Sequence, residues 1–224
     1  MAPSLVLFDI DGTLTRKAGP HHPAALENAI LQVTGLPAVT EGIPVHGMLD
    51  SVILTLMLRA AGMSDAEIRS TLPAVMEAAE ELYQHGVPDL RDKRCPGVPE
   101  VLDELTSRGA VLALVTGNLT RIAWHKLSRA GIHHYFQFGA FGEMAPTRGE
   151  LAKMAVERAL KEGLIGSAAR ISLIGDTPAD IKAARDAGVQ AIAVRTGVST
   201  PEELNAACPD VLLDDLTRLD LAIV

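Results

Sequence analysis

The chain has 224 residues, of which 48% are hydrophobic and 21% are charged, so it is long enough to bury a full core in one large domain or two small ones. Its formal net charge is −8, and one Trp, two Tyr and four Phe leave few rings on which nucleobases could stack. This balance argues against a nucleic-acid partner and against binding to an anionic membrane surface.

Cysteine usage and apolar run lengths bear on the compartment. Cys95 and Cys208 stand far apart with no second thiol nearby, so we expect two buried, inert thiols and no thiolate metal site. The residues before Asp9 carry no basic region, which argues against a signal peptide. The apolar runs are shorter than the roughly 18 residues of a spanning helix. We therefore expect a soluble, cytoplasmic protein.

Short, continuous apolar runs recur along the chain and end in polar or Gly-rich residues. They are found at 5–8, 110–115, 171–174, 191–194 and 211–213. Continuous apolarity is typical of strands buried on both faces, and helix-period segments lie between the later runs. The pattern predicts an α/β fold with a doubly wound parallel sheet.

The stretch from about 23 to 94 differs, because it holds helical stripes and no convincing strand. Apolar residues repeat at three and four positions within 26–33, 49–60 and 68–82. The sequence therefore predicts a small all-α domain over residues 16–94, inserted into an α/β core made of 1–15 and 95–224.

Polar side chains follow three of the predicted strands, where the ligand crevice of an open parallel sheet lies. Asp9 and Asp11 follow the first strand, Thr116 follows the second, and Asp176 and Asp180 follow the strand at 171–174. Carboxylates held close together repel unless one is protonated or a cation lies among them. We therefore expect an oxygen-rich Mg²⁺ site at this edge, with Thr116 and the Gly117 amide as donors for phosphoryl oxygens.

Three motifs carry a family resemblance. The Asp-Ile-Asp-Gly-Thr sequence at 9–13 resembles the first motif of the haloacid dehalogenase superfamily, DxDGT. Residues 116–118 resemble its second motif, and 175–180 its fourth, GDxxxD. The inserted helices match the superfamily's helical (C1-type) cap. The whole layout looks like the phosphoglycolate-phosphatase-like branch.

The resemblance implies a role for each residue. Asp9 would be the nucleophile, and Asp11 the acid and then the base. Asp9, the backbone carbonyl of Asp11 and Asp176 would hold Mg²⁺. Residues Thr116, Gly117 and Asn118 would bind the substrate phosphate, while Asp180 would support the site by orienting the basic residue or a metal-bound water.

The chain departs from the family at the third motif, where relatives commonly carry a lysine. Residues 144–148 contain none, so Arg148 is the candidate for that basic, phosphate-binding role, with bidentate geometry that a lysine lacks. Lys153 is the alternative, although we expect it to face solvent. For Lys126, about two turns into the helix after Thr116, the alternatives are a side chain that points back toward the site and one that faces solvent, and we expect the second.

The resemblance predicts a Mg²⁺-dependent phosphatase of a small soluble phosphate monoester, phosphoglycolate or a sugar phosphate among the candidates. A sugar-phosphate mutase and a catalytically silent binding protein are the alternatives, and Asp9 and Asp11 together argue against the silent one. Asp11 also argues against a dehalogenase, since halide leaves without a proton. We expect the protein to be a monomer or a homodimer. Candidate specificity residues are Arg16, Lys17, His21, His22 and 46–50.

Overall fold

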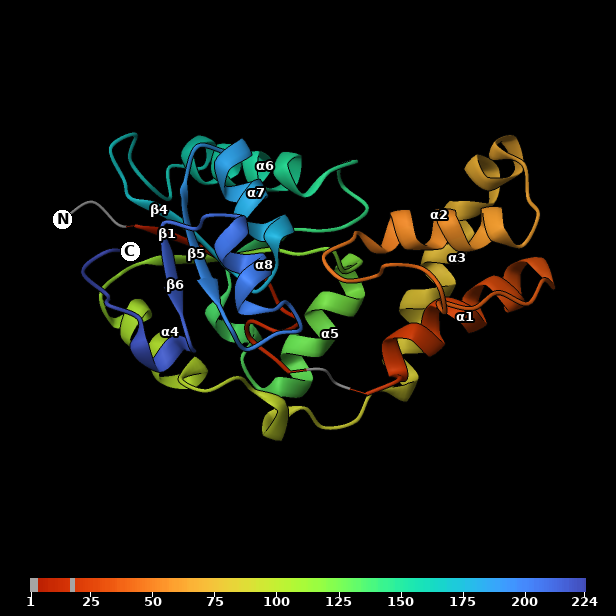
Figure 1. Ribbon diagram of the computed structural model, residues 1–224, viewed down its shortest axis with the longest axis horizontal. Helices are drawn as coiled ribbons and strands as arrows, with labels where there is room; N and C mark the ends of the chain where they lie inside the picture. Colours follow the sequence, from red (N-terminus) through yellow and green to blue (C-terminus); the bar gives the residue numbers. More distant parts are fainter. Residues whose placement is uncertain (1–3, 17–18) are drawn as a thin grey trace.

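The computed structural model describes residues 4–16 and 19–224. A central sheet lies between two layers of helices, and three further helices pack together at one end (Figure 1). Residues 1–3 and 17–18 lie outside the described residues. They include Lys17, a candidate specificity residue, and part of the segment on which the expectation about a signal peptide depends.

The sheet has six strands, all parallel, in the order β3-β2-β1-β4-β5-β6. The strands are β1 (Leu5–Phe8), β2 (Val111–Val115), β3 (Phe138–Ala140), β4 (Ile171–Gly175), β5 (Gln190–Val194) and β6 (Val211–Leu213). The five predicted strands are confirmed. The sequence pattern missed β3, a three-residue edge strand that pairs with β2.

Alternate residues of each strand pack on opposite faces, as the pleat requires. Val6 and Phe8 join one apolar cluster with α4 (Val98–Ser107) and α5 (Thr120–Ala130). Leu5 and Leu7 join the other cluster, with the helices of the second layer. These are α6 (Arg148–Lys161), α7 (Pro178–Asp186) and α8 (Pro201–Ala206). The doubly wound α/β prediction is confirmed.

Apart from residues 17–18, the region between β1 and α4 forms three α-helices and no strand, as its periodicity predicts. They are α1 (His21–Thr34), α2 (Asp50–Ala60) and α3 (Asp65–Gly86). Ser64 starts α3 with a capping box, because its hydroxyl accepts from the Glu67 amide while the Glu67 carboxylate accepts from Ser64. The three helices lie together at one end of the molecule, and α5 lies between them and the sheet (Figure 1). The exact domain boundaries stay a prediction.

Single turns of 3-10 helix complete the chain, at Arg91–Lys93, His133–Tyr135 and Leu216–Arg218. Cys95 is buried, but the expectation for Cys208 is wrong, because that thiol is exposed in a turn after α8. Across residues 4–16 and 19–224, we find no helix whose length and apolarity would let it cross a bilayer.

Candidate active site

The register of the sheet brings the first and fourth motifs together. Phe8 of β1 pairs with Leu114 of β2 and with Ile174 of β4, so the residues that follow the strands emerge at the same edge. Chain order reverses between β1 and β4, which is where open α/β sheets bind ligands. Asp9 leaves β1 at this point and Asp176 follows β4.

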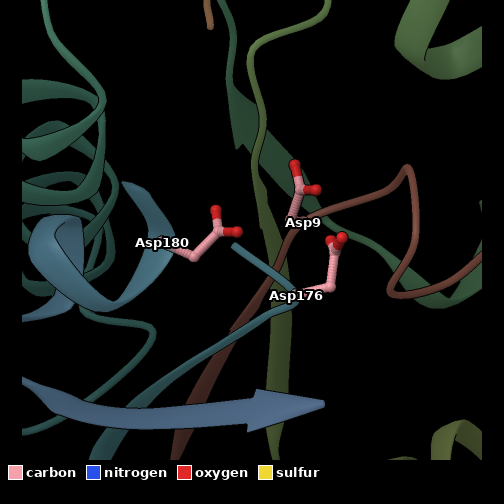
Figure 2. Close-up of side chains that lie close together, drawn as sticks. All are labelled: Asp9, Asp176 and Asp180. Carbon is pink, nitrogen blue, oxygen red and sulfur yellow. The ribbon is translucent and has the colours of Figure 1, made fainter. Parts of the chain in front are cut away.

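Three buried carboxylates meet there. Figure 2 shows the side chains of Asp9, Asp176 and Asp180 converging from β1, from the end of β4 and from the first turn of α7. One oxygen from each lies within 4.8 Å of the others, and each residue is at most 4% exposed. Gly12 permits the close approach, because its φ is +91° and a Cβ there would lie 2.3 Å from an Asp176 oxygen.

Arg148, the first residue of α6, is the cation of this cluster. Its Nη1 lies 3.1 Å from Asp9 Oδ1 and donates to Asp180 Oδ1. The other Asp180 oxygen accepts from the Thr177 amide and hydroxyl, at 3.0 and 2.7 Å, so both Asp180 oxygens are engaged. Asp180 thus braces Arg148 and the start of α7. Lys153, the alternative basic residue, is exposed.

The cluster carries more negative than positive charge. Burial raises the pKa of Asp9 to about 7, with Arg148 opposing the rise and Asp180 and Asp11 adding to it. Burial also raises the pKa of Asp176 to about 9, and Asp180 and Asp9 add to that rise. The Arg148 pKa lies above its ordinary value, because Asp180 and Asp9 outweigh its burial.

This donor set fits a hard divalent cation. Asp9 Oδ1 is buried and accepts no hydrogen bond from the residues that the structure describes. Asp176 Oδ1 accepts one side-chain bond, from Thr13 at 3.1 Å. Carboxylate oxygens are the ligands that Mg²⁺ prefers, and a cation among them would relieve the repulsion that raises both pKa values.

Asp11 is not part of this cluster and has a different environment. Its Oδ2 accepts from Lys126 Nζ at 2.5 Å and from Asn118 Nδ2 at 2.8 Å. The expectation that Lys126 faces solvent is wrong, because its side chain is 1% exposed. Burial raises the Asp11 pKa, but the charge of Lys126 and the nearby His22 oppose it, and the net pKa lies below its usual value.

The second motif connects these groups. Thr116 is fully buried, and its hydroxyl oxygen accepts from Asn118 Nδ2 at 2.8 Å. The Gly117 carbonyl accepts from the Asp50 amide of α2 at 2.8 Å, and a Cβ on Gly117 would lie 2.2 Å from the Met48 carbonyl oxygen. Only glycine allows the chain before α2 to pack this closely on the loop at 116–118.

A cavity of about 370 Å³ lies between these motifs and α1–α2. Of the predicted site residues, it is lined by Asp9, Asp11, Gly117, Asn118, Arg148 and Asp176. Thr116 and Asp180 do not line the cavity. Direct phosphate binding by the Thr116 hydroxyl therefore stays a prediction.

Some of the candidate specificity residues reach the cavity and others do not. Arg16, His22 and most of the segment 46–50 line it, whereas His21 does not. Sequence reasoning set Lys126 aside, although its position in the apolar stripe of α5, beside Ile122, Ala123 and Leu127, signals burial.

Comparisons with known proteins agree with this geometry. Residues 3–188 match the family model of haloacid dehalogenase-like hydrolases. The chain is 30% identical to a phosphoglycolate phosphatase of Vibrio cholerae over 224 residues, covering 98% of this chain and 97% of the relative. It is 27% identical to one of Pseudomonas putida, covering 97% and 78%.

Among solved structures, β-phosphoglucomutase of Clostridium difficile has a similar fold, with a TM-score of 0.70 and 19% identity. The match covers 99% of this chain and 95% of that one. At this identity the likeness concerns the fold alone.

Proposed function

The chain belongs to the haloacid dehalogenase-like hydrolase family, as a phosphoric monoester hydrolase, and from that premise we propose that it is a Mg²⁺-dependent phosphatase of a small soluble phosphate monoester. The observation that carries the proposal is the buried Asp9 carboxylate, which lines the cavity beside Arg148. Its Oδ1 forms an ion pair with Arg148 but accepts no hydrogen bond from the described residues. An anionic ester could approach Asp9 only where positive charge offsets this cluster.

In the first step Asp9 attacks phosphorus in line with the leaving oxygen. A bond forms between an Asp9 oxygen and phosphorus and the bond from phosphorus to the alcohol oxygen breaks. Asp11, which this step requires in its protonated form, donates its proton to that oxygen. Arg148 and the amide of Gly117, two residues that line the cavity, hold phosphoryl oxygens. The product is the free alcohol and a phosphorylated Asp9.

In the second step Asp11, now a carboxylate, takes a proton from a water that attacks phosphorus. The acyl phosphate bond breaks, phosphate leaves and Asp9 is regenerated. The carboxylates of Asp9 and Asp176 and the backbone carbonyl of Asp11 would hold Mg²⁺, which when bound offsets the charge of the phosphoryl group.

Substrate size follows from the cavity. A volume of about 370 Å³ is at the small end of the range for ligand sites and suits a small metabolite better than a polymer. Phosphoglycolate is one candidate, because the curated relatives carry that name. Sugar phosphates are another.

The test is phosphate release from a panel of phosphate monoesters that includes phosphoglycolate and several sugar phosphates, with Mg²⁺ and with EDTA. We expect metal-dependent release from at least one member. A sugar phosphate converted to its isomer with no phosphate released would instead favour the mutase alternative. No reaction with any member, and no phosphorylated Asp9 by mass spectrometry, would favour a silent binding protein.

A further inference from the structure

We propose that Lys126 is a positioning residue for Asp11, which fixes one oxygen of the Asp11 carboxylate and leaves the other directed at the oxygen of the departing alcohol. The inference rests on the proposed function and extends it to a residue outside the three motifs.

The contacts of Lys126 account for all three of its N–H donors. Its ammonium group has three N–H donors and finds three acceptors, Asp11 Oδ2 at 2.5 Å, Asn118 Oδ1 at 2.7 Å and His22 Nδ1 at 3.3 Å. The side chain is 1% exposed, while that of Asp11 is 39% exposed and lines the cavity. The lysine therefore holds Asp11 from behind, and the carboxyl group remains open to the substrate.

Helices α1 and α2 support this arrangement. His22 Nε2 lies 2.9 Å from Asp50 Oδ2, and the same oxygen accepts from the Leu119 amide at 3.0 Å. When Nδ1 of His22 accepts from Lys126, Nε2 carries the hydrogen and donates to Asp50, so each donor in this series of hydrogen bonds has an acceptor. The series joins α1 and α2 to the loop at 116–118 and ends at Asp11.

Asn118 fixes the same carboxylate oxygen from a second direction. Its Oδ1 accepts from Lys126 and its Nδ2 donates to Asp11 Oδ2 at 2.8 Å. Lys126 and Asn118 therefore hold each other as well as Asp11. Two donors on Oδ2 restrict rotation of the carboxyl group and leave Oδ1 as the oxygen for proton transfer.

Stability alone does not explain a lysine at this position. A buried ion pair is often no more stable than well-packed apolar residues of the same volume. Lys126 lies in line with the apolar residues of α5, where leucine or methionine would suit the core. Its position within hydrogen-bond reach of Asp11 is what a positioning role requires.

The test uses the dependence of turnover on the alcohol that leaves. An alkyl alcohol needs a proton from Asp11, whereas p-nitrophenol leaves as a stable phenolate. Because Asp11 also serves as the base in the second step, which both esters share, the readout is the rate at which alcohol is released in the first turnover. We expect Lys126→Met to lower this rate on an alkyl phosphate by about 10²-fold, because misplaced catalytic groups cost about that much. On p-nitrophenyl phosphate we expect the first-turnover rate to fall within about threefold, because general acid catalysis contributes little there. Asp11→Asn is the benchmark and should show the same selectivity with a larger loss.

Two further variants keep the test decisive. Lys161→Met removes an exposed lysine from α6 and should leave both rates unchanged. His22→Ala removes one acceptor from Lys126 and should show the selective loss at a smaller size. If thermal unfolding shows that Lys126→Met does not fold, His22→Ala takes its place in the test.

Equal losses on both esters, or no loss on either, would overturn the positioning role. A wild-type protein that releases phosphate from no ester of the panel would instead overturn the proposed function, so the two failures are distinguishable.

Discussion

Two groups of charges in the site differ in charge balance. In the first group, the crowded side, Asp9, Asp176 and Asp180 share one cation among the described residues, Arg148, and the pKa values of Asp9 and Asp176 are raised to about 7 and about 9. In the second group, the balanced side, Asp11 has its own cation, Lys126, and its pKa is lowered.

This difference teaches how one sheet edge can serve two chemical purposes. A surplus of negative charge is accommodated only with protons or with a bound cation, so the first side is suited to a metal. A balanced pair needs no further ion, so Asp11 can keep one orientation while the charge of the substrate changes. Under the proposed function, two acids only two residues apart would thereby have different roles.

The largest expected effect comes from Asp9→Asn. We expect kcat to fall by at least about 10⁴-fold on all esters, because the nucleophile is lost. The substitution also removes charge from the crowded side, so it should not lower the melting temperature measured in EDTA. Asp11→Asn is the matched comparison from the balanced side. If Asp9→Asn retained turnover on any ester, Asp9 would not be the nucleophile.

Arg148→Met should have the next largest effect, on stability. It removes the cation of the crowded side and leaves Asp9 and Asp180 buried without a partner, which should cost about 3–5 kcal/mol of unfolding free energy. Urea denaturation in EDTA measures this. Lys153→Met, on the same helix but exposed, should stay within about 0.5 kcal/mol of wild type. Similar values for both variants would contradict the proposed role of Arg148 in the cluster.

Without metal, the carboxylates of the crowded side should make the stability of the protein depend on pH. Because the folded pKa values of Asp9 and Asp176 are raised, the folded state holds protons that the unfolded state releases above about pH 4. In EDTA their stabilising contribution is therefore greatest at acid pH and is lost as the pH rises through about 7 and about 9. Melting curves from pH 5 to 9 measure this loss.

Saturating Mg²⁺ should offset the loss of stability at high pH. Mg²⁺ at 100 times its Kd should add about 2.7 kcal/mol, and its effect should be larger at pH 9 than at pH 5, where protons compete. Asp176→Asn should abolish the Mg²⁺ effect. Identical melting curves with Mg²⁺ and with EDTA would exclude a metal site at these carboxylates.

The smallest expected effect is that of Thr13→Val. The Thr13 hydroxyl donates to Asp176 Oδ1 at 3.1 Å. In saturating Mg²⁺, where Asp176 is a carboxylate, its loss should cost about 1.5 kcal/mol, as for hydrogen bonds to charged groups. Thr55→Val removes a hydroxyl that donates to a neutral carbonyl within α2 and should cost less. Urea denaturation of both variants checks the order. The opposite order would argue against a charged Asp176.

Most of the fold and the acidic groups of the site were predictable from local patterns. Continuous apolar runs predicted five strands, and the residues directly after them predicted Asp9, Asp11 and Asp176 at one edge. Arg148 was predicted only through the family resemblance, as the basic residue near the place where relatives carry a lysine. The strand β3 was not, because three residues show no period, and it forms only by pairing with Val115 and its neighbours at the sheet edge.

The sequence by itself determined the alternation of strands and helices and the motifs at the strand ends, because both depend on residues that are near one another in the chain. Tertiary structure alone decided the partners of those motifs. Lys126 and Asp11 are 115 positions apart, and His22 and Asp50 reach them from separate helices. Such partners are fixed by the packing of α1 and α2 against α5 and its loop, which a period along the chain does not encode.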